Sequence, residues 1–183
     1  MTLASIGALL VAVTVAASSA VQVIEPEHSP ESRAADMAEM GITSGNGYTE
    51  CEYTHYDIPL SDEYQEYVTD VCEVYGLDPR IIFGIAYQES RFQADVTGDG
   101  GRAHGMYQVH PRWHSERMVK LGVTDLYDPY QAVWVCADFL AEVLNEYGSY
   151  EEALTYYRYG TLTATGEPYA DIVMTQAYSF PER

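Results

Sequence analysis

A long run of apolar residues at helical spacing, between residues 129 and 148, constrains the fold of this chain most. The run opens at Asp128-Pro129, a pair that favours a helix start, and stops at Gly148, a residue that favours a helix end. Between these signals apolar side chains recur every three or four positions, at Ala132, Val133, Cys136, Phe139, Leu140, Val143 and Leu144. The sequence therefore predicts a long helix with one buried face.

Other segments carry the same spacing or the same end signals. They are the ranges 61–76, 79–92, 111–121 and 149–160, of which the third is short and weak. The last of them begins with Ser149 and Glu152, a pair that forms a capping box. Residues 93–110 are expected to form a loop. No sustained two-residue alternation indicates a sheet, so the predicted fold class is mainly α.

Glu89 lies on the apolar face of the predicted helix that precedes this loop. Ile82, Ile85 and Ala86 stand seven, four and three positions before it and share its face. Burial against apolar side chains disfavours the ionised form of a carboxyl group and raises its pKa. A carboxyl that keeps its proton near neutral pH can act as a general acid. The alternative is a structural glutamate that pairs with Arg91 or with a backbone group.

Two later segments supply groups that suit a sugar ligand. The glycine-dense stretch 98–105 favours a loop whose backbone approaches a ligand closely. Residues 153–160 end a helix with three tyrosines and a glycine, and tyrosine offers both a flat apolar face and a hydroxyl group. The chain holds 17 tyrosines, and their grouping near these segments favours a carbohydrate groove. The alternative is that the tyrosines fill a small helical core.

In order and spacing, these segments resemble the catalytic domain of soluble-type lytic transglycosylases, a fold related to goose-type lysozyme. Residues 89–90 (Glu-Ser) stand at the family's Glu-Ser pair, and residues 105–108 (Gly-Met-Tyr-Gln) stand at its Gly-Leu-Met-Gln. Residues 126–129 (Leu-Tyr-Asp-Pro) resemble the Asn-Pro segment before its long helix. Residues 157–160 (Tyr-Arg-Tyr-Gly) stand at Ala-Tyr-Asn-x-Gly. The resemblance covers residues 62–175.

The resemblance implies a lysozyme-like helical domain with a glycan-binding groove. It implies that Glu89 is catalytic and that the substrate is bound by Ser90, Tyr107, Gln108, Tyr157 and Arg158. Two positions depart from the family pattern, because Arg158 replaces an asparagine and Tyr107 replaces a thioether residue. Both departures could retune substrate preference, or they could mark a domain that binds glycan without cutting it.

The activity that the resemblance implies is cleavage of the bond between N-acetylmuramic acid and N-acetylglucosamine in peptidoglycan. Glu89 would protonate the leaving oxygen and then act as base for the C6 hydroxyl of the substrate, which forms a 1,6-anhydro product. That hydroxyl is tethered to the reacting ring, so a second carboxylate is not required. Four aspartates could still supply one, but no motif ties them to Glu89: Asp95, Asp99, Asp125 and Asp128.

Three other functions stay open at this point. A hydrolytic muramidase on the same fold would use an aspartate of the 95–99 loop to activate water, and its product would contain that water. A catalytically silent peptidoglycan-binding or assembly module would work equally well without the Glu89 carboxyl. A helical adhesion or scaffold domain would have no affinity for peptidoglycan.

Composition excludes some partners. The formal net charge is −19 with nine lysines and arginines, so no basic stripe is available for nucleic acid. No Cys or His pair has metal-ligand spacing, and we expect neither a metal nor a cofactor. The expected partner is the glycan strand of peptidoglycan, and the protein is expected to be a monomer.

The N-terminal region predicts export. Residues 3–24 are uncharged and rich in Ala, Val and Leu, which indicates a signal peptide or membrane anchor over residues 1–24. The first basic residue is only Arg33, and a buried soluble helix is the alternative. Residues 25–58 are interpreted as a linker and 59–183 as the transglycosylase-like domain. We expect a location in the cell envelope or outside the cell, with the N-terminus as a membrane anchor if it is retained.

Three cysteines, Cys51, Cys72 and Cys136, suit an oxidising compartment if one pair forms a disulfide, which leaves one thiol over. The last two also lie on apolar helix faces, where free cysteines act as small hydrophobes.

Basic and imidazole side chains are concentrated in and just after the predicted loop. His104, His110 and His114 are interpreted as polar lining of a groove. Arg102 and Arg112 lead to the hypothesis that they meet carboxylates of the peptidoglycan peptide stem.

Overall fold

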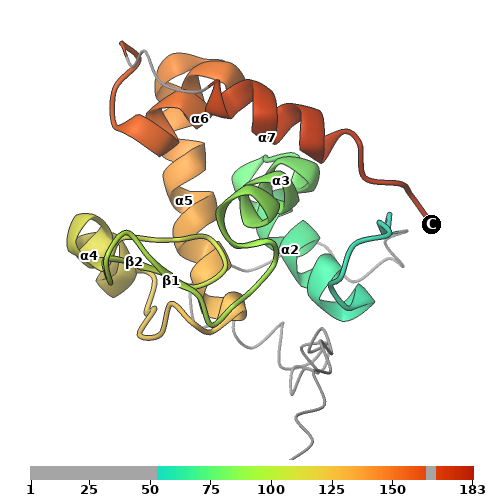
Figure 1. Ribbon diagram of the computed structural model, residues 1–183, viewed down its shortest axis with the longest axis horizontal. Coiled ribbons are helices and arrows are strands. Elements are labelled where there is room, and N and C mark those ends of the chain that lie inside the picture. The colour runs from blue at the N-terminus through green and yellow to red at the C-terminus, as the bar shows by residue number, and fades with distance from the viewer. Residues whose placement is uncertain (1–52, 164–167) are drawn as a thin grey trace, which may run out of the picture.

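Helix α5, Pro129–Tyr147, is the long buried helix that the sequence predicts, and α2, α4 and α6 pack against it (Figure 1). The computed structural model describes residues 53–163 and 168–183. In this part of the chain the other elements are α2 Asp62–Tyr75, α3 Pro79–Ser90, β1 Thr97–Gly98, β2 Ala103–His104, α4 Pro111–Lys120, α6 Tyr150–Tyr159 and α7 Tyr169–Ala177. The prediction of a mainly α, lysozyme-like fold is confirmed.

Helix α5 and the start of α6 lie where local signals predict. The side chain of Asp128 accepts a hydrogen bond from the backbone N–H of Tyr130 at the start of α5, and Pro129 occupies the first turn. The hydroxyl of Ser149 accepts from the backbone N–H of Glu152, as the capping box predicts. Gly148 ends α5 with a φ of 85°, which a glycine adopts without strain. These ends are therefore fixed by nearby residues alone.

Tyrosine hydroxyls join α2 to the rest of the core. Tyr64 is fully buried, and its hydroxyl donates to the carbonyl of Pro129 at 3.0 Å while it lies 2.9 Å from the hydroxyl of Tyr107. The indole N–H of Trp134 donates to the hydroxyl of Tyr67 at 2.8 Å. The hydroxyls of these three tyrosines thus each have a partner, as burial requires. For these tyrosines, the interpretation as core residues is correct.

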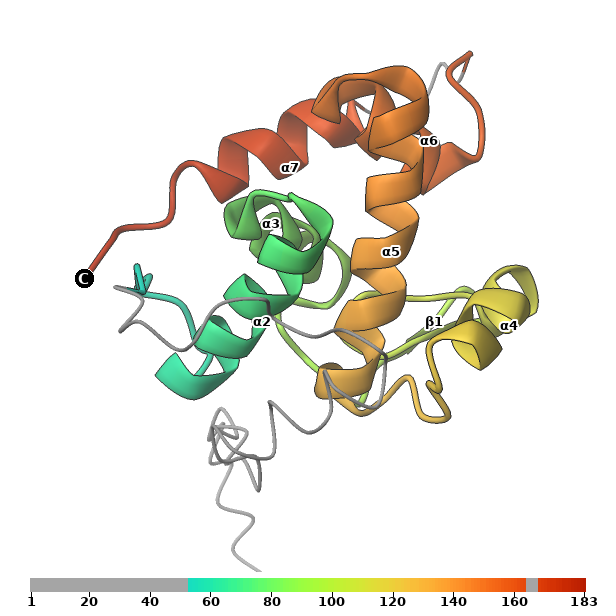
Figure 2. The ribbon, with the colours of Figure 1, turned by 180° about the vertical axis from the view of Figure 1, so that it is seen from behind.

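Helix α7 packs closely on α3 because α3 carries a glycine at the contact (Figure 2). A Cβ atom added at Gly84 would lie 2.9 Å from the carbonyl oxygen of Val173 and 3.0 Å from the Cβ atom of Ala177. Both distances are shorter than van der Waals contact. The approach of the two helices therefore depends on the absence of a side chain at residue 84.

The predicted loop 93–110 contains a small antiparallel hairpin, which the sequence did not reveal. Thr97 pairs with His104, and Gly98 pairs with Ala103. Two-residue strands are too short to show the alternation that predicts a sheet. Gly105, at a φ of 73°, follows the hairpin, and a Cβ there would lie 1.8 Å from the carbonyl oxygen of Leu126. The hairpin is thus held against the segment that leads into α5.

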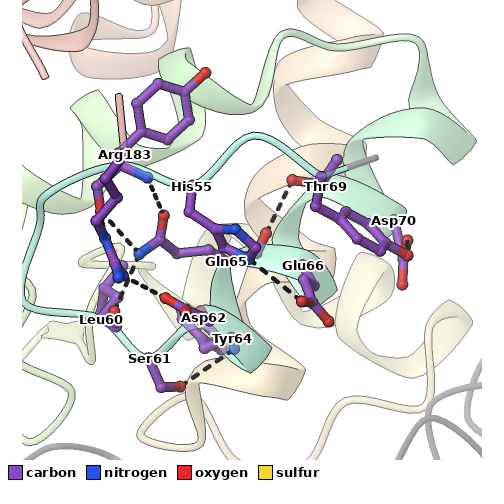
Figure 3. A network of polar contacts seen from close by, with 12 residues as sticks. His55, Leu60, Ser61, Asp62, Tyr64, Gln65, Glu66, Thr69, Asp70 and Arg183 are labelled. Carbon is purple, nitrogen blue, oxygen red and sulfur yellow. Dashed lines mark hydrogen bonds and ion pairs between the residues drawn. The ribbon is translucent and has the colours of Figure 1, made fainter. Parts of the chain in front are cut away.

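The side chain of Gln65 ties the start of the described chain to its end. This fully buried amide accepts from the backbone N–H of Tyr56 at 2.8 Å and donates to the carbonyls of Tyr56 and Leu60. Figure 3 shows that Arg183 joins this network; its guanidinium donates to the Tyr56 carbonyl at 3.0 Å and pairs with Asp62. Tyr56 is buried, so the last residues of the predicted linker, 53–58, pack as part of the domain. The sequence did not reveal this because the contact is made by backbone groups.

Cys72 and Cys136 are free and buried. Cys51 lies outside the described residues, and so do residues 1–24 with the predicted signal peptide or anchor. Within residues 53–163 and 168–183, no helix has the length and apolar character needed to cross a membrane.

Candidate active site

Glu89 lies in the last turn of α3, and its side chain is 9% exposed. Ile82, Ile85 and Ala86, which share its helix face, are fully buried. The sequence prediction of a carboxyl group against a hydrophobic core is therefore confirmed for the position of this side chain. The small exposed fraction leaves the carboxyl within reach of a ligand.

Two side chains from later helices contact this carboxyl. The hydroxyl of Tyr169, the first residue of α7, donates to Oε1 of Glu89 at 2.6 Å. Arg158, near the end of α6, places Nη1 3.5 Å from Oε2. The guanidinium of Arg158 also lies over the ring of Tyr169, 5.6 Å from its centre. Helices α3, α6 and α7 thus each contribute one member of this cluster.

The pKa of Glu89 is raised, and burial is the largest cause. The hydrogen bond from Tyr169 lowers this pKa, as do the positive charge of Arg158 and the charge of His110, but together they do not cancel the effect of burial. Burial and the neighbouring Glu89 also raise the pKa of Tyr169 far above its ordinary value, so the phenol keeps its proton and acts as donor. A buried carboxyl with a raised pKa has the property that a general acid requires.

The alternative of a structural glutamate paired with Arg91 does not describe this site. The Arg91 guanidinium lies over the ring of Tyr87 and donates to the Tyr87 carbonyl at 2.9 Å. The cation beside Glu89 is Arg158, whose side chain is 52% exposed. An ion pair of this length and exposure is weak, which is consistent with the raised pKa of the carboxyl.

Ser90 points away from Glu89 into the protein. Its side chain is buried, and its hydroxyl donates to the carbonyl of Ala86 at 3.1 Å and accepts from the backbone N–H of Gln93 at 3.1 Å. Successive residues of a helix point about 100° apart, so Ser90 lies on a different side of α3 from Glu89. Ser90 therefore stabilises the end of α3 through these two hydrogen bonds.

Tyr107 is also fully buried, and its hydroxyl faces Tyr64. Gln108 is half-buried and donates through Nε2 to the carbonyls of Val96 and Gly105, at 3.2 and 2.9 Å. Both residues hold the hairpin in place.

Tyr157 joins the hairpin segment to the surroundings of Glu89. Its hydroxyl donates to the carbonyl of Tyr107 at 3.3 Å, and its ring lies 5.4 Å from that of Phe139. Burial is the main cause of its strongly raised pKa, and Glu89 contributes to the same effect. The predicted site residues 89, 157 and 158 are thus brought together.

The structure adds two residues to the site that the sequence interpretation did not include in this role. Tyr169 stood within the region of family resemblance but in no motif, and its proximity to Glu89 follows only from the packing of α7 on α3. His110 was interpreted as groove lining, and its charge also acts on Glu89 without a direct contact. No local sequence signal identifies the contact of Tyr169 or this effect of His110.

The other two histidines that were interpreted as groove lining have structural partners. His114 accepts a hydrogen bond at Nδ1 from Arg117 at 3.1 Å and packs on Phe139, and burial lowers its pKa to about 4. The ring of His104 stacks on that of Tyr127, with 5.2 Å between their centres.

No aspartate or glutamate in the described part of the chain contributes to the pKa shift of Glu89. Asp99 pairs with Arg102 at 2.7 Å and lies 3.8 Å from His110. Asp125 accepts from the backbone N–H of Tyr127, and Asp128 caps α5. Three of the four aspartates that could act as a second carboxylate are therefore engaged elsewhere.

Comparison with known proteins identifies related sequences. The family model described as Transglycosylase SLT domain matches residues 66–167. The chain is 38% identical over 87 residues to the transglycosylase of Enterobacteria phage PRD1, across 48% of this chain and 31% of the phage protein. It is 30% identical over 95 residues to the invasion protein IagB of Salmonella typhimurium, across 49% of this chain and 59% of IagB. The match therefore spans less than two thirds of either relative.

Among solved structures, an inactive mutant of lytic transglycosylase Slt from Pseudomonas aeruginosa is similar over 63% of this chain and 21% of that chain. The TM-score is 0.49 and the sequence identity is 22%.

Proposed function

Because this chain belongs to the transglycosylase SLT domain family, we propose that it is a lytic transglycosylase acting on peptidoglycan. The bond cleaved is the one between N-acetylmuramic acid and N-acetylglucosamine. The observation that carries the proposal is the buried carboxyl of Glu89, whose pKa is raised and which Tyr169 holds by a 2.6 Å hydrogen bond. Such a group can deliver a proton to the bridging oxygen of a glycosidic bond.

In this proposal Glu89 is the single acid and base. It protonates the leaving oxygen as that oxygen's bond to the anomeric carbon breaks, and the resulting carboxylate then takes the proton of the C6 hydroxyl. The C6 oxygen bonds to the anomeric carbon and closes the 1,6-anhydro ring, so no water enters the product. The engagement of Asp99, Asp125 and Asp128 by other groups supports a route without a second carboxylate.

The other residues divide into two roles. Arg158 and Tyr157 lie at or beside Glu89 and are proposed to contact the sugar, together with Tyr169. Ser90, Tyr107 and Gln108 are proposed to act through position, by fixing the end of α3 and the hairpin. Their hydrogen bonds to backbone and core groups support this division.

The substrate lies in the cell wall, so we also propose that the protein is exported and works in the cell envelope. The uncharged segment 3–24 supports export, either as a signal peptide or as an anchor.

Product mass tests the chemistry. Purified peptidoglycan is digested with the wild type and the soluble fragments are weighed. A lytic transglycosylase releases fragments lighter by one water than those of a hydrolase. Fragments that carry the added water would instead favour a muramidase, although the pairing of Asp99 with Arg102 and His110 speaks against that aspartate as its base.

The Glu89→Gln variant tests the assigned residue. Loss of a general acid lowers turnover by about 10²- to 10⁴-fold, and the isosteric amide leaves the fold intact. Glu116→Gln, an exposed position on α4, is the matched control. Equal release of fragments by Glu89→Gln and wild type would show that Glu89 is not the acid, and no release by the wild type would show that the chain does not cut glycan.

A further inference from the structure

A pocket formed by the hairpin and the start of α4 has no part in the reaction described so far. It has a volume of about 480 Å³, and its lining includes Asp99, Arg102, His104, His110, Arg112 and Trp113. These residues come from the hairpin and the start of α4, which lie together on one side of α5 (Figure 1). The pocket is within the size range of small-ligand sites.

His110 connects this pocket to the acid. It lines the pocket, it lies 3.8 Å from the carboxylate of Asp99, and its charge acts on Glu89. The pocket thus lies within electrostatic range of Glu89, a separation that neighbouring groups of one bound polymer strand can span.

The charge of the pocket contrasts with that of the protein. The whole chain has a formal charge of −19, yet two arginines and two histidines line this pocket against one aspartate. Arg102 is occupied by that aspartate, at 2.7 Å. Arg112 is exposed and lies over the ring of Trp113, and within residues 53–163 and 168–183 no carboxylate pairs with it. A guanidinium with free donors favours a carboxylate ligand.

The indole of Trp113 completes the pocket. This side chain is 71% exposed, which is unusual for so large an apolar group. It offers a flat face to an aliphatic or peptide segment next to the charge that Arg112 would bind. The ligand that fits both features is a short chain with apolar atoms and a free carboxylate.

We propose that this pocket binds the peptide stem of peptidoglycan, with Arg112 holding a stem carboxylate, Trp113 covering the adjacent peptide and Arg102 in a supporting role. The inference rests on the proposed function, because a glycan strand at Glu89 carries its stems on the lactyl groups of the muramic acid rings. The pocket then distinguishes strands that carry stems from bare glycan.

Two polymers test this proposal. Strands with intact stems and strands stripped of stems by an amidase are offered to the wild type, Arg112→Ala and Lys120→Ala. Lys120, at the end of α4 and outside the pocket, is the matched cation. A partly exposed charge contact is worth up to about fivefold, so Arg112→Ala should lower kcat/KM about fivefold on strands with stems. It should leave bare strands unchanged, and Lys120→Ala should change neither.

An equal loss on both polymers would make the pocket a sugar subsite, and no loss on either would leave Arg112 without a role; both overturn the inference. A wild type that cuts neither polymer refutes the proposed function instead. In that case calorimetry with a free tetrapeptide stem still tests whether the pocket binds the stem. Weaker binding to Arg112→Ala, and weaker binding of a stem with amidated carboxyls, would support the proposal. No binding to the wild type would refute it.

Discussion

The hydroxyl of Tyr169 donates a 2.6 Å hydrogen bond to Glu89, a residue 80 positions earlier in the chain. The bond favours the carboxylate form, and it is the strongest of the contacts that lower the pKa of Glu89 against the effect of burial. The phenol therefore sets how readily Glu89 releases its proton.

Replacement of Tyr169 by phenylalanine should raise the pKa of Glu89. The ring stays in place, while the hydrogen bond that favours the ionised form is lost. The high-pH limb of the kcat/KM profile, where the general acid loses its proton, should move to higher pH. Tyr178→Phe, which removes an exposed hydroxyl beyond α7, is the control and should leave the profile unchanged. A limb that stays or moves to lower pH in Tyr169→Phe would disprove this role.

Replacement of Arg158 by glutamine should also move the high-pH limb of the kcat/KM profile to higher pH. The guanidinium lies 3.5 Å from the carboxyl and lowers its pKa less than Tyr169 does, so the shift should be smaller. The side chain is 52% exposed, so added salt should reduce the difference between wild type and variant. Arg158→Lys retains the charge and should keep the limb near that of the wild type. A salt-independent shift would point to a change of shape instead of charge.

Glu89→Gln should stabilise the protein at neutral pH. The folded-state pKa of Glu89 is raised above the ordinary value of 4.5, so between the two values the folded protein keeps a proton that the unfolded chain releases. The free energy of unfolding of the wild type therefore falls as the pH rises through that window. Glutamine has no such loss. Urea denaturation should show that the variant is more stable than the wild type at pH values above this window. The gain should vanish near pH 4, where Glu89 is mostly protonated in both the folded and the unfolded state. A gain of equal size at both pH values would assign it to packing.

Gly84→Ala should separate α3 from α7. The added Cβ meets the carbonyl oxygen of Val173 at 2.9 Å, and overpacking of this kind costs about 1–3 kcal/mol, against about 1 kcal/mol gained from the better helix propensity of alanine. We expect a net loss of roughly 1 kcal/mol in the free energy of unfolding, measured in urea. Turnover should fall as well, because α7 carries Tyr169. A variant as stable as the wild type would show that α7 can shift away from α3 without a loss in the free energy of unfolding.

Local signals were sufficient to predict helices α2 to α6 and the position of the acid, but they did not predict α7. Asp128, Pro129 and Gly148 act on their own backbone, and the apolar face of Glu89 follows from the helical period. The direction in which neighbours point was harder to predict. Ser90 and Tyr107 occupy motif positions, yet their side chains turn to the backbone and the core.

Contacts between distant segments could not be predicted from one sequence. The pairing of Tyr169 with Glu89 depends on the close approach of α3 and α7 at Gly84, and the pairing of Arg158 depends on where α6 ends. The side chains of Gln65 and Arg183 likewise both bind the backbone of Tyr56, and Arg183 is distant from it in the chain. Backbone groups carry no sequence signature, so these contacts could not be predicted.

Tyr169 is the first residue of α7, and a helix end is the part of a helix that opens most readily. Tyr169 is also 5% exposed and belongs to the hydrophobic core, so its burial holds this first turn closed. The same packing that stabilises the end of the helix therefore keeps the phenol on the acid.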